Sequence, residues 1–90
     1  PRIIVVFHKR GCGACEEFLP RAERISQAHA GIGTAVLETT HPAADSLQVY
    51  FTPTTFLLRH GTPVRRIEGA ADDAEVEALY AENAENYRRS

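Results

Sequence analysis

The sequence predicts a single α/β domain spanning residues 1–90, in which helices cover both faces of a mixed four-stranded sheet. Short β-branched runs alternate with segments of helical periodicity, and 90 residues are enough for only one thin core. Hydrophobic residues make up 43% of the chain and charged residues 24%, which argues against disorder and against a coiled coil. The predicted order of elements is β-α-β-(α)-β-β-α.

The first half of the chain predicts a β-α-β unit. Residues 2–7 are an almost continuous apolar, β-branched run, which is typical of a strand buried on both faces. Residues 34–38 predict a second strand, and a right-handed crossover should make the two strands parallel. Between them, Gly31 and Gly33 end a helix. Apolar side chains at spacings of three and four give this helix its inner stripe: Phe18, Leu19, Ala22, Ile25 and Ala28.

The second half predicts a short helix followed by a β-hairpin. Residues 43–49 follow a His-Pro turn and form the short helix. Residues 54–58 and 63–67 form the third and fourth strands, joined by a tight turn in which Gly61 takes a positive φ. Proline cannot donate a hydrogen bond to a neighbouring strand, so Pro63 predicts that the fourth strand lies at an edge of the sheet.

A last helix should begin near Asp72, which stands three residues before Glu75 as in a capping box. Its predicted inner stripe comprises Val76, Leu79, Tyr80 and Ala84.

Charge and hydropathy exclude several classes of partner. Ten Lys and Arg residues against twelve Asp and Glu leave a net charge of −2, so no basic excess attracts nucleic acid. The longest apolar run is far shorter than the ~18 residues that a membrane span needs, and no signal peptide is recognisable. We therefore expect a cytoplasmic monomer without nucleic acid or membrane partners.

Both cysteines of the chain, Cys12 and Cys15, stand between the first strand and the first helix. A thiolate at a helix N-terminus faces unpaired N–H groups and the positive end of the helix dipole, so the pKa of Cys12 should be lowered. We expect Cys12 to be exposed and nucleophilic, and Cys15, one turn further on, to be buried and to act as the resolving thiol. The spacer residues Gly13 and Ala14 are small enough for a substrate disulfide to approach closely.

Three residues just before the pair could support its chemistry. His8, Lys9 and Arg10 bring positive charge, which would lower the thiol pKa further. His8 could also assist proton transfer to Cys15. The alternatives are a polar residue at the end of a strand for His8 and a solvated loop charge for Lys9.

A single CxxC can also be half of a zinc site. The remainder of such a site would be a second CxxC or a pair of closely spaced histidines. The four histidines stand at positions 8, 29, 41 and 60, and the chain has no further cysteine. We therefore expect no metal, and we favour a redox pair over two incidental buried cysteines.

The chain resembles the thioredoxin-fold dithiol oxidoreductases, the thioredoxins and glutaredoxins, over nearly its whole length. Four features carry the resemblance: the strand leading into Cys12–Cys15, the helix-kinking Pro20, the Thr52-Pro53-Thr54 sequence, and Gly69-Ala70 before the last helix. It implies a minimal thioredoxin fold in which Pro53 is cis and lies beside the cysteines. It also implies that the backbone at Thr52 pairs with an extended substrate.

The chain departs from the thioredoxin pattern at several positions. Gly11 stands where thioredoxins usually carry a Trp directly before the first cysteine, and Ala14 stands where they commonly carry Pro. Val6 replaces the buried Asp that thioredoxins keep under the pair. Because the first predicted strand corresponds to the central strand of thioredoxins, we expect a fold without their N-terminal β-α unit, as in short glutaredoxins.

The resemblance implies a thiol-disulfide oxidoreductase that serves electron transport and cell redox homeostasis. Its substrates would be disulfide-containing proteins such as ribonucleotide reductase, and thioredoxin reductase or glutathione would reduce it, with no metal or bound cofactor. One alternative is a glutaredoxin that binds glutathione near Pro53, Gly69-Ala70 and Lys9. The segment at Gly69-Ala70 is also consistent with a simple helix cap. Another is a non-catalytic adaptor, and a third is an oxidant or isomerase.

Overall fold

The computed structural model describes the backbone of residues 2–89 and the side chains of residues 2–81, so the predicted place of Ala84 on the inner stripe of the last helix lies outside the described side chains. The order of elements is the predicted one: β1 (Arg2–His8), α1 (Gly13–Gln27), β2 (Gly33–Glu38), α2 (Pro42–Ser46), β3 (Thr54–Arg59), β4 (Thr62–Glu68) and α3 (Asp73–Arg89). The prediction for α2 was too long, because Gln48 takes a left-handed φ of 56° and the chain leaves the helix before it. Ala28 was wrongly placed on the buried stripe of α1, since it is the exposed C-cap of that helix.

The strands form one sheet in the order β2-β1-β3-β4. β1 pairs with β2 in parallel, with Val5 opposite Ala35. β1 also pairs with β3 antiparallel, with Val5 opposite Phe56, and β3 and β4 form the antiparallel hairpin. β4 is therefore an edge strand, as Pro63 predicts, and Gly61 takes the predicted positive φ, 79°.

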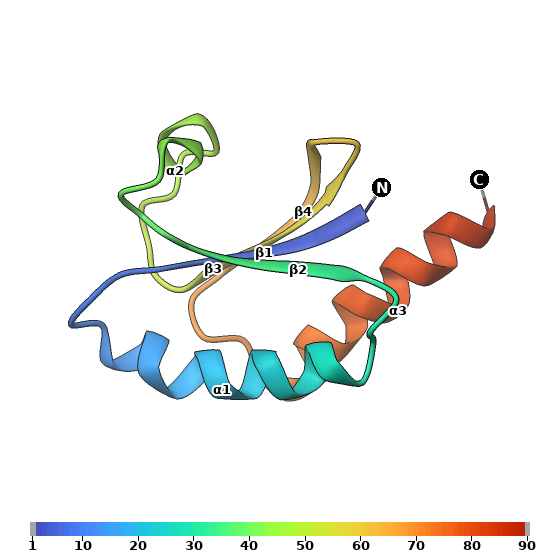
Figure 1. The fold of residues 1–90 in the computed structure, drawn as a ribbon, viewed down its shortest axis with the longest axis horizontal. Coiled ribbons are helices and arrows are strands. Elements are labelled where there is room, and N and C mark those ends of the chain that lie inside the picture. The colour runs from blue at the N-terminus through green and yellow to red at the C-terminus, as the bar shows by residue number, and fades with distance from the viewer. Residues whose placement is uncertain (1, 90) are drawn as a thin grey trace.

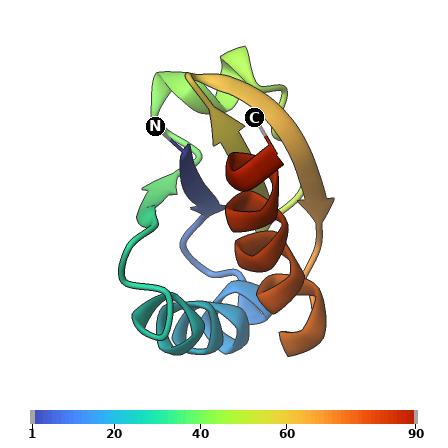
Figure 2. The same cartoon turned by 90° about the vertical axis from the view of Figure 1, so that its right-hand side faces the viewer.

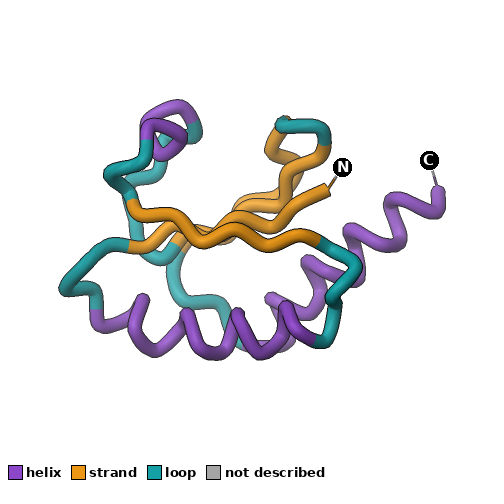
Figure 3. The backbone as a smooth tube through the Cα atoms, in the orientation of Figure 1, coloured by secondary structure: helices purple, strands orange, loops and turns teal. Residues whose placement is uncertain are grey.

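Helices cover the two faces of the sheet unequally (Figure 1). α1 and α3 lie together under one face, and the short α2 lies over one end of the other, as the tube view also shows (Figure 3). The core under α1 and α3 holds Ile4, Val6, Phe18, Ala22, Ile25, Leu57, Ala71, Val76, Leu79 and Tyr80. The core under α2 is smaller and holds Val5, Phe7, Ala44 and Phe56. Figure 2 shows from a second direction that α3 begins beside α1 and then runs away from it at a steep angle.

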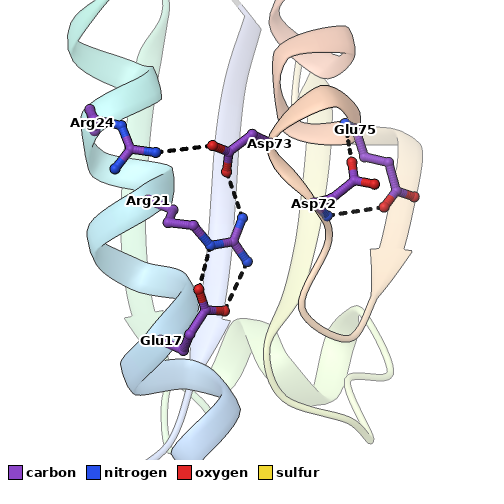
Figure 4. Close-up of polar contacts among 6 residues, drawn as sticks. All are labelled: Glu17, Arg21, Arg24, Asp72, Asp73 and Glu75. Carbon is purple, nitrogen blue, oxygen red and sulfur yellow. Dashed lines mark hydrogen bonds and ion pairs between the residues drawn. The ribbon is translucent and has the colours of Figure 1, made fainter.

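Ion pairs join α1 to α3 on the outer surface (Figure 4). Arg21 donates to Glu17 at 2.6 Å and to Asp73 at 2.7 Å, and Arg24 donates to Asp73 at 3.0 Å. The hydrogen bonds from Arg21 lower the pKa of both carboxyl groups below their ordinary values. These ion pairs lie at the surface, so each should add only a little to stability.

The predicted capping box at the start of α3 is present (Figure 4). The Glu75 N–H donates to Asp72 Oδ1 at 2.9 Å, and the Asp72 N–H donates to Glu75 Oε1 at 3.1 Å. These bonds satisfy two N–H groups that the helix itself leaves without partners. Along the described part of the chain, no helix has the length and hydrophobicity to cross a membrane.

Candidate active site

The cysteine pair lies where β1 gives way to α1. Gly11 turns the chain with a φ of 75°, a left-handed conformation that side chains other than glycine rarely adopt. Cys12 is then the N-cap of α1, with extended backbone, and the Cys15 N–H donates to Cys12 Sγ at 3.1 Å. A disulfide joins the two cysteines, whose Cα atoms are 5.2 Å apart. The loop and the first helical turn thus bring both sulfurs together.

The two sulfurs have different surroundings. Cys15 is 1% exposed, because it begins the inward stripe of α1 that continues through Phe18, Ala22 and Ile25. Cys12 lies at the rim and is partly buried. It is less exposed than the sequence suggested, because the loop before β3 packs beside it. In the reduced protein, the helix N-terminus would favour the thiolate at Cys12 and burial would disfavour it at Cys15.

Thr52 is the residue of this loop that contacts Cys12. Its Oγ1 donates toward Cys12 Sγ at 3.5 Å, and its carbonyl oxygen lies 3.6 Å from the same sulfur. The Thr52–Pro53 peptide bond is cis, and the Pro53 side chain is buried. The resemblance drew attention to the Thr52 backbone, whereas the hydroxyl contact was not foreseen.

Neighbouring hydrogen bonds hold the loop in place. The buried Thr54 hydroxyl donates to the Phe51 carbonyl at 2.6 Å, and the Gly69 N–H donates to the Pro53 carbonyl at 2.8 Å. Gly69 is therefore linked to the site by its hydrogen bond to Pro53. Its φ of 90° is a conformation that residues other than glycine rarely adopt. Tyr50 and Phe51 are 77% and 60% exposed, which leaves an aromatic surface just before the cis bond.

The remaining predicted site residues lie around the pair without contacting the sulfurs through hydrogen bonds. Gly13 and Ala14 are exposed on the first turn of α1, as a spacer open to a substrate would be. Lys9 and Arg10 are exposed, and His8 is partly buried at the end of β1. In the described region, none of these three donates a hydrogen bond to either sulfur.

Ala70 and the capped start of α3 follow Gly69. Ala70 is exposed, and Asp72 uses its carboxylate in the capping box. The helix-cap interpretation of this segment thus has direct support. Among the described side chains, no three His, Cys, Asp or Glu residues gather in a way that could hold a metal ion.

Comparison with known proteins places the chain in a family. The thioredoxin family profile matches residues 1–82. No curated protein matches the chain by sequence. The structure is similar to a thioredoxin of Fasciola hepatica, with a TM-score of 0.82 and 23% identity over 90% of this chain and 79% of that one. A Plasmodium falciparum thioredoxin gives a TM-score of 0.82 at 20% identity, over 90% of this chain and 80% of that one. Because the profile spans most of the chain and the fold agrees with it, the chain belongs to the thioredoxin family and is a thiol-disulfide oxidoreductase.

Proposed function

We propose that the protein reduces disulfides of partner proteins in the cytoplasm through the Cys12-Gly13-Ala14-Cys15 dithiol. The observation that carries this proposal is the asymmetry of the pair. Cys12 Sγ lies at the rim, where it accepts hydrogen bonds from the Cys15 N–H and the Thr52 hydroxyl, whereas Cys15 is buried. Such an arrangement suits an attacking thiolate and a protected resolving thiol.

The proposed cycle has two exchange steps. The Cys12 thiolate attacks one sulfur of the substrate disulfide, which forms a mixed disulfide and releases the other substrate sulfur as a thiolate that takes up a proton. Cys15, after losing its proton, attacks Cys12 Sγ, forms the Cys12–Cys15 disulfide and releases the second substrate thiolate. The substrate gains two electrons and two protons in total, and the dithiol loses them. An external reductant then restores the dithiol.

Gly11, Gly13 and Ala14 would leave the approach to Cys12 Sγ open. Pro53 and the backbone of Thr52 would receive an extended segment of the substrate beside the sulfur, in the manner of strand addition. Gly69 would support this surface through its hydrogen bond to the Pro53 carbonyl. The aromatic surface of Tyr50 and Phe51 adjoins the same place and suits a substrate with apolar side chains near its disulfide.

Insulin reduction tests the proposal, with NADPH and thioredoxin reductase as the electron source. Cys12→Ser should abolish turnover, and Cys15→Ser should accumulate a mixed disulfide that gel electrophoresis detects without reductant. Unchanged turnover in Cys12→Ser would refute the mechanism. Thioredoxin reductase is preferred over glutathione as the reductant, since Asp72 is engaged in capping α3. Faster recycling by glutathione with glutathione reductase would favour the glutaredoxin alternative, and partner binding that survives loss of both cysteines would favour the adaptor.

Natural substrates in this proposal are cytoplasmic proteins that form a disulfide in each catalytic cycle, such as ribonucleotide reductase. The protein would act as a monomer.

A further inference from the structure

The guanidinium of Arg66 joins the edge strand β4 to the end of α2. Its terminal nitrogens donate to the Leu47 carbonyl at 2.7 Å and to the Gln48 carbonyl at 2.6 Å. Its Nε donates to Glu68 at 3.0 Å. The guanidinium also lies 5.1 Å from the centre of the Phe56 ring, on the face of the sheet that α2 covers. One side chain thus contacts two carbonyls, a carboxylate and an aromatic ring.

The two carbonyls that Arg66 binds follow the end of α2, where the backbone needs hydrogen-bond donors from outside the helix. α2 ends at Ser46 and Leu47 is its C-cap, so the carbonyls of Leu47 and Gln48 have no N–H donor within the helix. Gln48 takes a left-handed φ of 56°, so the chain turns sharply there toward the loop that follows. Among the described residues, the side-chain hydrogen bonds between this helix end and the sheet come from Arg66.

The apolar contact of α2 with the sheet is small. The helix has five residues, of which only Ala44 is buried, and Ala43, Leu47 and Val49 add partly buried contacts at its two ends. Alanine buries too little apolar area to fix a helix strongly. Arg66 is suited to the task because its planar fork can donate to several acceptors at once, which the single ammonium group of a lysine cannot reproduce.

The loop that starts at this helix end leads directly to the active site. α2 and the turn between β1 and α1 lie at the same end of the sheet (Figures 1 and 3). The far end of the loop is fixed by the hydrogen bonds from Thr54 to Phe51 and from Gly69 to Pro53. Its near end is fixed to the sheet through the Arg66 contacts. Thr52 lies within this loop and contacts Cys12 Sγ.

We propose that Arg66 is a positioning residue, which ties the end of α2 to β4 and thereby holds Thr52 against Cys12 Sγ. The inference rests on the proposed role of Cys12 as the attacking thiolate. Arg66 itself contacts neither cysteine. Its effect is transmitted through the Leu47–Thr52 segment, and it depends on the shape of the guanidinium rather than on its charge alone.

The test compares Arg66→Lys and Arg66→Met with the wild type in the reduced protein. The readout is the pH midpoint of the rate at which iodoacetamide alkylates Cys12. Both variants should raise this midpoint, by up to about half a unit if most of the Thr52 contact is lost. Arg24→Met is the matched control, because it removes an arginine from an exposed ion pair on the far end of α1. It should leave the midpoint unchanged.

Two results would overturn the inference. A wild-type midpoint in Arg66→Lys, with a raised one in Arg66→Met, would show that the charge acts through space. The second is that Arg66→Lys raises the midpoint as much in a Thr52→Val background as in the wild type. Arg66 would then act on Cys12 by a route that does not involve the Thr52 hydroxyl. If Arg66→Met fails to fold, Arg66→Lys and its combination with Thr52→Val decide the question.

The charged and titratable residues within five positions of Cys12 in the sequence are unchanged in every variant: His8, Lys9, Arg10, Glu16 and Glu17. Glu68 loses its arginine partner in both Arg66 variants, so the Thr52→Val background separates that change of charge from the effect on the loop. The midpoint is measured on the thiol itself and does not require turnover. A failure of the proposed function, seen as insulin reduction that persists in Cys12→Ser, is therefore distinguishable from a failure of this inference.

Discussion

Replacing Thr52 by valine should raise the pKa of the Cys12 thiol in the reduced protein. Thr52 Oγ1 donates toward Cys12 Sγ at 3.5 Å, and valine has nearly the same shape without the donor. A hydrogen bond to a charged group contributes roughly 1.5–3 kcal/mol. This contact is long and its acceptor is sulfur, so we assign it about 1 kcal/mol.

That free energy converts to a pKa increase of about 0.7, because one pKa unit corresponds to about 1.4 kcal/mol. The variant should therefore hold less thiolate at neutral pH and react several times more slowly with iodoacetamide there. The Cys15 N–H and the helix N-terminus still favour the thiolate, so the pKa should stay below the ~8.5 of a free cysteine.

The assay is the pH dependence of alkylation at Cys12, followed by mass spectrometry after a short pulse. Thr52→Ser is the matched control, because it keeps the hydroxyl and removes only a methyl group. Its midpoint should stay close to that of the wild type. An equal midpoint in the valine variant and the wild type, or an equal rise in both variants, would show that the hydroxyl does not stabilise the thiolate.

Three further predictions concern stability. Gly11→Ala should lower the free energy of unfolding by about 1 kcal/mol in urea titration, because Gly11 has a φ of 75°; no loss would contradict the need for a left-handed residue. Tyr80→Phe should cost about 1 kcal/mol, because the buried Tyr80 hydroxyl lies 2.6 Å from Thr34 Oγ1; a Thr34→Val background should remove most of this cost. Hydrogen bonds from Arg21 lower the pKa of Asp73 below its ordinary 3.8. They therefore stabilise the folded protein fully above pH 3.8, and this stabilisation is lost as the pH falls through the lowered pKa of the folded state. Asp73→Asn should make acid unfolding less steep, and an unchanged acid profile would show that the ion pair is dispensable.

The order of elements could be predicted because each one has a local signature. The β-branched run of β1, the three-and-four spacing along α1 and the capping box of α3 are all visible within a few residues. The end of α2 could not be predicted, because it depends on the left-handed φ of Gln48, and glutamine has no particular preference for that conformation. The carbonyls freed by that turn are satisfied by a residue of β4, far along the chain.

Some residues of the candidate site could be predicted from the sequence and others could not. Cys12 and Cys15 could be located at the start of α1, because the strand before them and the helix after them are contiguous in sequence. The contact of Thr52 with Cys12 joins residues 40 positions apart, so only the resemblance could suggest their proximity. The resemblance predicted a role for the Thr52 backbone, whereas the contact of its hydroxyl with Cys12 is visible only in the folded structure. Arg66 had no signal of its own, because an arginine on an edge strand ordinarily points to solvent.

The two thiols have different surroundings, and the resemblance places the apolar Val6 where thioredoxins carry a carboxylate. Val6 is 1% exposed and belongs to the apolar core on the face of the sheet that α1 covers. Cys15 is equally buried on the inward stripe of that helix, and burial favours the neutral thiol. Cys12, in contrast, has two hydrogen-bond donors and the helix N-terminus beside it. In the proposed cycle, Cys12 would therefore be ionised before the substrate arrives, whereas Cys15 would lose its proton only once the mixed disulfide has formed. In this proposal, the burial of Cys15 delays its ionisation until after the first step, and the Thr52 contact favours the ionisation of Cys12 that the first step needs.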